Sequence, residues 1–367
     1  MKDILPKNLI TVLDSIILHG GKPILVGGSV RDYFFGISCS DYDTEVYNLA
    51  TLDKLVEILK TFGSVNFVGK SFGILKLYCK EEVYDFSFPR QENKIGLGHK
   101  EFLVTINGNL NFKEATRRRD FTINSIGYDY ETNQFLDPFD GIIDIYNRTL
   151  KHIDKKSFIE DPLRVYRASQ LCARFELEID IATKQLCQDI VLNEDFQLLS
   201  KERIFHEYEK LLLQSTRPSI GLSLLTQLNI INISSDISKN IDDMVQYKTL
   251  KKKDNLVLMF YFISNILTSI SDNKVLKKTI NELQKFQVPK IYNNQLKNIH
   301  NEAEEIFIKY SIMNNMPQSF LSGKDLISLG YKPSEKFGIA LKEVYKKQLD
   351  GEICNKKEAE KLLSTLL

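Results

Sequence analysis

The sequence contains few of the features that mark secreted, membrane-bound or disulfide-stabilised proteins. No apolar run reaches the length of a membrane span, and residues 1–16 read as an amphipathic helix rather than a secretion signal. The cysteines are scattered and form no Cys-x-x-Cys pair, which argues against a disulfide scaffold or a structural zinc site; they are Cys39, Cys79, Cys172, Cys187 and Cys354. We therefore expect a cytoplasmic protein with reduced thiols and no membrane partner.

An excess of charge of either sign is also lacking. The 49 Lys and Arg residues nearly balance the 48 Asp and Glu residues, so overall charge does not indicate a nucleic-acid ligand. Any site for a polyanion must come from local clusters such as the basic stretches 148–156 and 248–254. The composition is that of a globular protein, and 367 residues exceed one comfortable hydrophobic core. We expect two or more domains.

The residue pattern changes near position 150. Short runs rich in branched and aromatic residues, punctuated by Gly, Pro and Asp, predict strands at 22–28, 71–79, 82–88 and 134–141. Helical periodicity dominates afterwards, at 161–175, 201–213 and 255–270. The stretch 91–116 lacks clear periodicity and is predicted to be a loop. The pattern indicates a mixed α and β domain followed by a helical region.

A glycine pair and closely spaced acids stand out in the stretch GGSVRDYFFGISCSDYDTEV, residues 27–46. Gly27 and Gly28 follow a predicted strand and precede a short helix, where small residues let backbone N–H groups approach a phosphate. In a strand, Asp41 and Asp43 would point to the same face, and converging carboxylates repel unless a cation lies between them. Mg²⁺ suits one or two carboxylates, water and substrate phosphates.

A third acid, Asp85, lies in the alternating strand 82–88 and could join this pair. Strand, glycine turn, helix, paired acids and a later acidic strand are what two-metal nucleotidyl transfer needs. Taken alone, the paired acids could equally be a surface turn, and Glu45 is read as an exposed or structural position rather than a ligand. Further motifs must decide between these interpretations.

Four further stretches complete an ordered series. They are RRRDFTINSIGYD (117–129), LDPFDGIIDIYNRTLKHI (136–153), EDPLRVYRASQLCARF (160–175) and KERIFHEYEKLL (201–212). With GGSVRD and DYD, they closely resemble the motifs of the class II, bacterial-type tRNA nucleotidyltransferase and poly(A) polymerase family. The resemblance implies an α+β fold: a polymerase-β-like nucleotidyltransferase head at 1–150, a helical neck with a nucleotide-selecting helix at 151–215, and a tRNA-binding helical body and tail at 216–367.

The resemblance also assigns roles, position by position. It makes Asp41 and Asp43 the metal ligands and Asp85 the supporting catalytic acid. It assigns nucleotide contacts to the glycine pair Gly27 and Gly28 and to residues Arg31, Arg119, Asp120, Asp161, Arg164 and Arg167. From the residues alone, the arginine run could be a solvated face and Asp120 a turn or cap.

The stretch 160–175 allows two interpretations. Asp161 fits a helix N-cap and Pro162 the first helical turn, while the arginines fall along one stripe opposite a packed side. The resemblance instead makes Asp161 and Arg164 the pair that reads the incoming base, and Arg167 a triphosphate contact. Gln170 departs from the family, where another arginine often stands.

The resemblance therefore implies template-independent addition of CTP and ATP to the 3′ end of tRNA, with Mg²⁺ as cofactor and release of pyrophosphate. No obligatory protein partner is evident from the sequence. The alternatives are a relative that adds only CC, only A or a poly(A) tail, or a catalytically silent RNA-binding protein. Clustered acids argue against the silent protein, because a pure RNA-binding surface has no use for carboxylates that face phosphates. None of the five histidines is followed by Asp, so no metal-dependent phosphohydrolase is expected.

Overall fold

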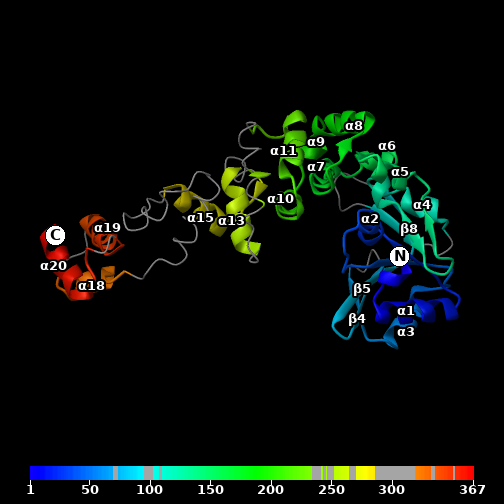
Figure 1. The fold of residues 1–367 in the computed structure, drawn as a ribbon, viewed down its shortest axis with the longest axis horizontal. Coiled ribbons are helices and arrows are strands. Elements are labelled where there is room, and N and C mark those ends of the chain that lie inside the picture. The colour runs from blue at the N-terminus through cyan, green and yellow to red at the C-terminus, as the bar shows by residue number, and fades with distance from the viewer. Residues whose placement is uncertain are drawn as a thin grey trace. The chain divides into compact units, whose positions relative to one another are not determined.

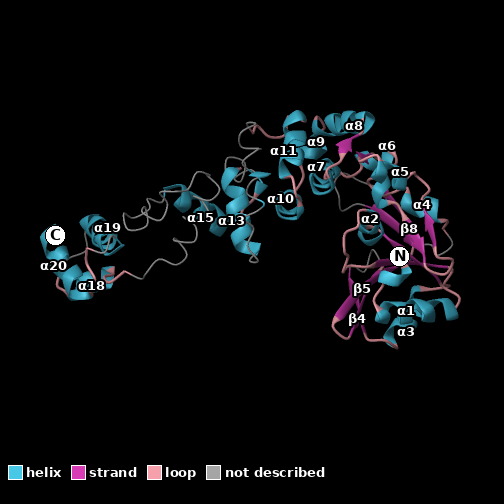
Figure 2. Cartoon of the chain, viewed as in Figure 1, coloured by secondary structure: helices cyan, strands magenta, loops and turns pink. Residues whose placement is uncertain are grey.

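A computed structural model gives the fold as two compact units, Met1–Ile233 and Ser234–Leu367. It describes residues 1–68, 73–94, 102–106, 110–233, 241–242, 245, 252–263, 270–285, 319–331, 335–349 and 352–367. Figure 1 shows the chain from its N-terminal sheet, in blue, to its C-terminal helices, in red. Within the described residues, the strands all lie in the first unit, and helices make up the second (Figure 2). The α+β class predicted from the sequence is confirmed.

The first unit is built on a seven-stranded sheet in the order β3-β4-β5-β2-β1-β8-β9. Strands β2 and β5 are parallel, and each of the other neighbouring pairs is antiparallel. The strands are β1 (Lys22–Val26), β2 (Asp43–Tyr47), β3 (Ser64–Val68), β4 (Ile74–Cys79), β5 (Glu82–Ser87), β8 (Gly127–Asp129) and β9 (Gln134–Leu136). Strands were expected at β1, β4, β5 and β9, and branched or aromatic side chains fit the pleated surface there.

Short helices pack against this sheet. Helices α1 and α3 contact each other and the strands β1, β3 and β4 (Figure 1). In α1, Leu9, Val12, Leu13 and Ile16 recur at helical spacing and are fully buried, so its apolar stripe anchors the N-terminus on the sheet. The elements are η1 (Lys2–Ile4), α1 (Lys7–Leu18), α2 (Gly28–Phe34), α3 (Leu52–Lys60), α4 (Phe112–Thr116), η2 (Thr122–Asn124) and α5 (Gly141–Tyr146).

The predicted loop at 91–116 is wrong in part. Strands β6 (Arg90–Lys94) and β7 (Phe102–Ile106) pair antiparallel as a separate two-stranded sheet, and α4 closes the stretch. The paired residues include charged and amide side chains on one strand, so the apolar alternation that identifies a strand is weak there. Positions 95–101 and 107–109 lie outside the described residues.

Helices follow the sheet within the first unit. They are α6 (Lys155–Ile159), α7 (Arg164–Phe175), α8 (Ile181–Val191), α9 (Glu194–Gln197), α10 (Lys201–Gln214) and α11 (Pro218–Gln227), with the short parallel pair β10 (Thr149–Leu150) and β11 (Glu178–Ile179). Helix α7 packs against both α10 and α11. A side chain at Gly221 would come within 2.5 Å of the Ser169 carbonyl oxygen, so glycine permits the close approach of α11.

The second unit contains α13 (Lys252–Phe262), α15 (Lys274–Lys285), α18 (Gly323–Ser328), α19 (Glu335–Leu349) and α20 (Lys356–Leu366). The last three helices share a core that includes Leu326, Val344 and Leu363. The basic stretch 248–254 lies outside the residues whose side chains are described. Across the described parts of the chain, none of the helices is long and apolar enough to cross a membrane. The division into head, neck and body at 150 and 215 remains a proposal.

Candidate active site

Three charged side chains form a row across adjacent strands. Asp43 begins β2 and stands opposite Asp85 of β5, and Asp85 stands opposite Lys76 of β4. Residues at the same register on neighbouring strands point to the same face of a sheet. The Lys76 ammonium donates to both Asp85 carboxylate oxygens, at 2.8 and 2.9 Å. The structure thus brings the predicted catalytic acids Asp43 and Asp85 together on one face.

Asp41 lies just before the strand. The expectation that Asp41 lies in the strand is wrong, because β2 begins at Asp43. Tyr42 between the two acids is buried, which agrees with the expected alternation of side chains. Both acids are exposed to solvent. Asp41 remains near enough to Asp43 to influence its ionisation.

The ionisation of Asp43 shows that negative charge is crowded here. Although the residue keeps an exposed surface, loss of water around its carboxyl, followed by repulsion from Asp41, raises the pKa of Asp43 from 3.8 to about 6, against the opposing effect of Arg119. A divalent cation at these carboxylates would relieve the repulsion, so the donor set suits a hard, oxygen-binding ion. Among the described residues, no group of three or more His, Cys, Asp or Glu side chains is arranged to hold a metal.

The glycine pair lies against this acid. Gly27 has φ 76° and ψ −135°, a backbone conformation that side chains other than glycine rarely adopt. A Cβ atom there would lie 3.3 Å from the Asp43 carboxylate and 3.5 Å from the Arg119 guanidinium. Gly28 then begins α2. The bare backbone at Gly27 therefore leaves room beside both charged groups.

Arg119 is held by a buried acid. Its Nη2 donates to Glu45 Oε1 at 3.0 Å, and its Nη1 donates to the Asn124 carbonyl oxygen at 3.4 Å. Glu45, which is 2% exposed, also accepts from the Tyr47 hydroxyl at 2.9 Å and pairs with Arg118 at 3.5 Å. Of the two expectations for Glu45, the exposed one is wrong and the structural one fits the geometry. Glu45 fixes the arginines that follow β7.

Arg31 is buried in α2, and each of its three guanidinium nitrogens donates a hydrogen bond. Its Nε and Nη2 donate to Asp32 Oδ1 at 2.8 and 2.6 Å, and its Nη1 donates to Asn124 Oδ1 at 2.7 Å. The Phe175 ring lies under its guanidinium, 4.6 Å from the ring centre. Burial lowers the pKa of Arg31, and Asp32 opposes that shift. Asp32 also accepts from Arg174 of α7 at 3.1 Å, which ties α2 to that helix.

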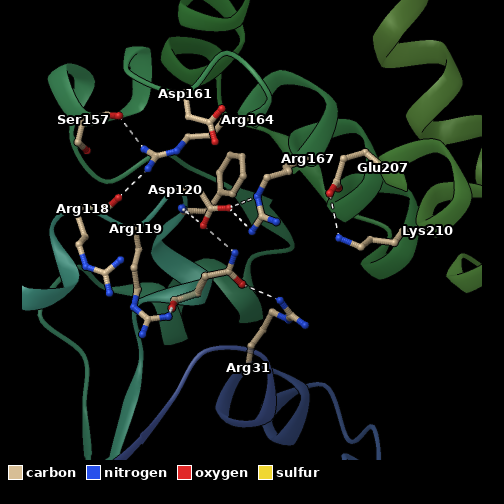
Figure 3. A network of polar contacts seen from close by, with 12 residues as sticks. Arg31, Arg118, Arg119, Asp120, Ser157, Asp161, Arg164, Arg167, Glu207 and Lys210 are labelled. Atoms are coloured by element: carbon tan, nitrogen blue, oxygen red, sulfur yellow. Dashed lines mark hydrogen bonds and ion pairs between the residues drawn. The ribbon is translucent and has the colours of Figure 1, made fainter. Parts of the chain in front are cut away.

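Asp120 is a further buried acid of the site (Figure 3). Its Oδ2 accepts from Nε and Nη2 of Arg167 at 2.7 and 2.6 Å, and its Oδ1 accepts from the Asn124 amide at 2.9 Å. Burial alone would raise the pKa of Asp120, but Arg167 and Arg164 hold it well below its ordinary value. The same carboxylate raises the pKa of Arg167. Asp120 is thus a permanently charged anchor for Arg167.

The start of α7 differs from the expected cap. The helix begins at Arg164 with Leu163 as its N-cap, so the interpretation of Asp161 as the N-cap and of Pro162 as the first helical turn is wrong. Asp161 Oδ1 instead accepts from the Leu163 N–H at 3.2 Å, within the turn before the helix. Both Asp161 oxygens accept from Nη2 of Arg203 in α10, at 3.2 and 3.1 Å. Proline disfavours helical backbone in the residue before it, so Asp161 stays outside the helix.

Arg164 connects α6 to the segment that follows α4. Its Nη1 donates to the Ser157 carbonyl at 2.9 Å and its Nη2 to the Arg118 carbonyl at 2.7 Å (Figure 3). A guanidinium has five N–H donors, so three remain for a ligand. The arginines of α7 therefore do not form a merely solvated stripe, and the opposite side of the helix, with Tyr166 and Cys172, is buried as expected. Gln170 is also buried, and its amide nitrogen has no hydrogen-bond partner within the described residues.

Sequence reasoning missed several residues that organise these groups. Asn124 and Arg203 lie inside the motif stretches 117–129 and 201–212, so their motif membership was the available signal. Lys76 carried no signal, because a lysine in an alternating strand usually faces solvent. Its role becomes visible only when β4 is placed beside β5.

Comparisons with known proteins identify relatives of this chain. Residues 24–151 match the Poly A polymerase head domain. The chain is 32% identical over 263 residues to a CCA-adding enzyme of Buchnera aphidicola subsp. Baizongia pistaciae, covering 71% of this chain and 59% of that protein. It spans 48% of the Multifunctional CCA protein of Mannheimia succiniciproducens, to which it is 35% identical over 57% of its own length. The chain thus covers only part of these relatives.

Solved structures show the same fold. The Bacillus stearothermophilus CCA-adding enzyme in complex with CTP matches with a TM-score of 0.69 at 22% identity, over 98% of both chains. The fold and the family match of residues 24–151 define a head of the poly(A) polymerase type. The chain belongs to the class II tRNA nucleotidyltransferase and poly(A) polymerase family, as its motif order predicts.

Proposed function

We propose that this protein adds cytidine and adenosine nucleotides to the 3′ end of tRNA without a template, with Mg²⁺ as cofactor. The observation that carries the proposal is the alignment of Asp43 and Asp85 on one sheet face, beside Gly27 and Arg119. The relatives are named CCA-adding enzyme and Multifunctional CCA protein, which supports CTP and ATP as substrates. A tRNA partner fits a family whose members act on tRNA. The cytoplasm is the compartment proposed for this reaction.

The reaction joins the terminal 3′ oxygen of the tRNA to the α-phosphorus of the nucleotide. The bond from that phosphorus to the bridging oxygen breaks, and pyrophosphate leaves. A divalent ion held by Asp41 and Asp43 would supply charge stabilisation for the phosphates and activation of the attacking hydroxyl. Asp85 supports the acids from the neighbouring strand. Arg31 of α2, Arg167 of α7 and Arg119, which follows α4, bind the phosphates or ribose.

Base choice belongs to Asp161 and Arg164. Cytosine and adenine both present an amine donor beside a ring-nitrogen acceptor on their pairing edge. A carboxylate accepts from the amine and a guanidinium donates to the ring nitrogen, so one protein edge serves both nucleotides. Asp161 Oδ1 already has two donors and Oδ2 has one, which leaves a lone pair of Oδ2 for the amine. Arg164 retains three N–H donors.

Arg203→Met is expected to lower the preference for CTP over UTP by about three- to tenfold, because Asp161 loses the donor that fixes both of its oxygens. The melting temperature should change little, since a partly exposed ion pair contributes about 0–1 kcal/mol to the free energy of unfolding. Single-nucleotide incorporation and thermal unfolding measure the two effects. Arg203→Lys keeps the charge but not the planar donor group, so its preference for CTP over UTP should lie between those of wild type and Arg203→Met. Unchanged selectivity in Arg203→Met would contradict this role.

The proposed function is tested with purified protein and tRNAs that end before C, after C, after CC and after CCA. Each is incubated with one labelled nucleotide, with and without a chelator, and the products are sequenced. We expect C on the first two, A on the third, nothing on the fourth, and loss of all addition without divalent ions. Addition of A alone, of CC alone or of long A tails would replace the proposal with the corresponding relative. No addition under any condition would contradict it.

A further inference from the structure

Asn124 occupies the centre of the polar network around the proposed nucleotide site. Its side chain accepts from Arg31 at 2.7 Å and donates to Asp120 at 2.9 Å, while its backbone carbonyl accepts from Arg119 at 3.4 Å. It therefore touches three residues that the motif resemblance assigns to the nucleotide. Through Asp120 it also reaches Arg167 of α7.

The charges on either side dictate how the amide is oriented. Asp120 is ionised and can only accept, and the Arg31 guanidinium can only donate. The carbonyl of Asn124 must therefore face Arg31, and its NH₂ group must face Asp120. Asn124, Arg31 and Asp120 are 6%, 7% and 7% exposed, so water cannot readily replace either bond. Neither aspartate, an apolar residue nor a hydroxyl can satisfy both neighbours with this geometry.

The network joins separate elements of the fold. Arg31 lies in α2, Asn124 in η2 and Arg167 in α7. Asp32 closes the same region from the other side, because it binds both Arg31 and Arg174. Asn124 and Asp120 thus link Arg31 to Arg167 directly by side-chain hydrogen bonds, while the Asp32–Arg174 pair holds α2 and α7 together beside them.

We propose that Asn124 is a positioning residue that couples Arg31 to the Asp120–Arg167 pair, so that both arginines meet the triphosphate of the incoming nucleotide as one unit. This inference rests on the proposed function. The triphosphate is common to CTP and ATP, so the coupling strengthens binding of both nucleotides equally and contributes nothing to the choice of base.

The test compares Asn124→Ala with a matched control in the same turn. Thr122 is also buried, and its hydroxyl donates to Asp144 at 2.6 Å, outside the network. Thr122→Val therefore removes one buried hydrogen bond while leaving Asn124 intact. Calorimetric titration with CTP and with ATP in the presence of Ca²⁺ gives affinity without requiring turnover, and thermal unfolding gives stability.

For Asn124→Ala we expect about ten- to a hundredfold weaker affinity for CTP and for ATP alike, because two hydrogen bonds to charged groups are lost. Thr122→Val should lower the melting temperature but leave both affinities at the wild-type value. The CTP to UTP preference in Asn124→Ala should equal that of wild type. Affinities unchanged in Asn124→Ala, or lowered no more than in Thr122→Val, would overturn the inference.

Two further variants keep the test decisive if Asn124→Ala folds poorly. Asn124→Asp keeps the shape and the acceptor for Arg31 but sets a second carboxylate against Asp120, so it should bind CTP as weakly as Asn124→Ala; wild-type affinity would overturn the inference. In an Arg31→Met background, the effect of Asn124→Ala should shrink to within about threefold. Fully additive effects would show that Asn124 does not act through Arg31.

The binding measurements separate this inference from the proposed function. If the wild-type protein binds CTP but adds nothing to tRNA, the proposed function fails and the role of Asn124 is still decided by affinity. If the wild-type protein adds nucleotides and Asn124→Ala binds them normally, only the inference fails. If the wild-type protein binds neither nucleotide, both fail.

Discussion

Asp43→Ala is expected to abolish nucleotide addition, with a loss of about a thousandfold or more in rate, while tRNA binding persists. A bound divalent ion contributes several kcal/mol of charge stabilisation to phosphoryl transfer, and removal of one of two carboxylate ligands forfeits most of it. Single-turnover incorporation of CTP under saturating Mg²⁺ measures the loss. Glu57→Ala, which removes an exposed carboxylate on α3, is the control and should retain full activity.

The same variant should not be less stable than wild type near neutral pH. The fold raises the pKa of Asp43 to about 6. The folded state therefore holds this proton more tightly than the unfolded chain does. The stabilising contribution of this group is present below its unfolded pKa and is lost as the pH rises through about 6. At pH 8 without divalent ions, Asp43→Ala should therefore melt at or above the wild-type temperature. Near-normal turnover would contradict the assignment of Asp43 as a metal ligand, and a strong loss of stability at pH 8 would contradict the raised pKa of its carboxyl.

Asp161→Ala is expected to lower discrimination against UTP and GTP by about ten- to a hundredfold. Uracil and guanine present a carbonyl to the position of the acid, and a buried mismatch costs about 1–3 kcal/mol per unpaired group. Without the carboxylate, uracil and guanine no longer incur that penalty, and cytosine and adenine lose the hydrogen-bond acceptor for their amine. Relative kcat/KM for the four nucleotides, on tRNAs lacking the terminal C or A, gives the ratio.

Asp161→Asn separates base reading from support of the turn. Its amide oxygen can keep the bond to the Leu163 N–H, while its NH₂ group takes the place of Oδ2 and offers a donor to the base. Selectivity should therefore shift further toward UTP than in Asp161→Ala, although the turn is better preserved. A purely structural role predicts that Asp161→Ala loses about 1 kcal/mol of stability with selectivity unchanged. That outcome would remove Asp161 from base reading.

Local signals were sufficient for the elements with strong patterns. The apolar stripe of α1, the helical run of α7 and the alternating residues of β4 and β5 could each be read from neighbouring positions, because burial of one face imposes a period on the chain. The hairpin β6–β7 could not. Strand β6 reads RQENK and has no apolar alternation, so the short apolar run of β7, FLVTI, had no recognisable partner strand in the sequence.

The partners of the charged residues could not be read from local patterns either. The sequence by itself determined which motifs the chain carries, their order, and the acids and arginines at Asp43, Asp85, Arg119 and Arg167. Only the tertiary structure decided their partners: Lys76 beside Asp85, Arg203 on Asp161 and Asn124 between two charged groups. Residues that meet across strands or helices are separated along the chain by intervals that no local period encodes, so contact partners emerge only when the sheet register and the helix packing are fixed.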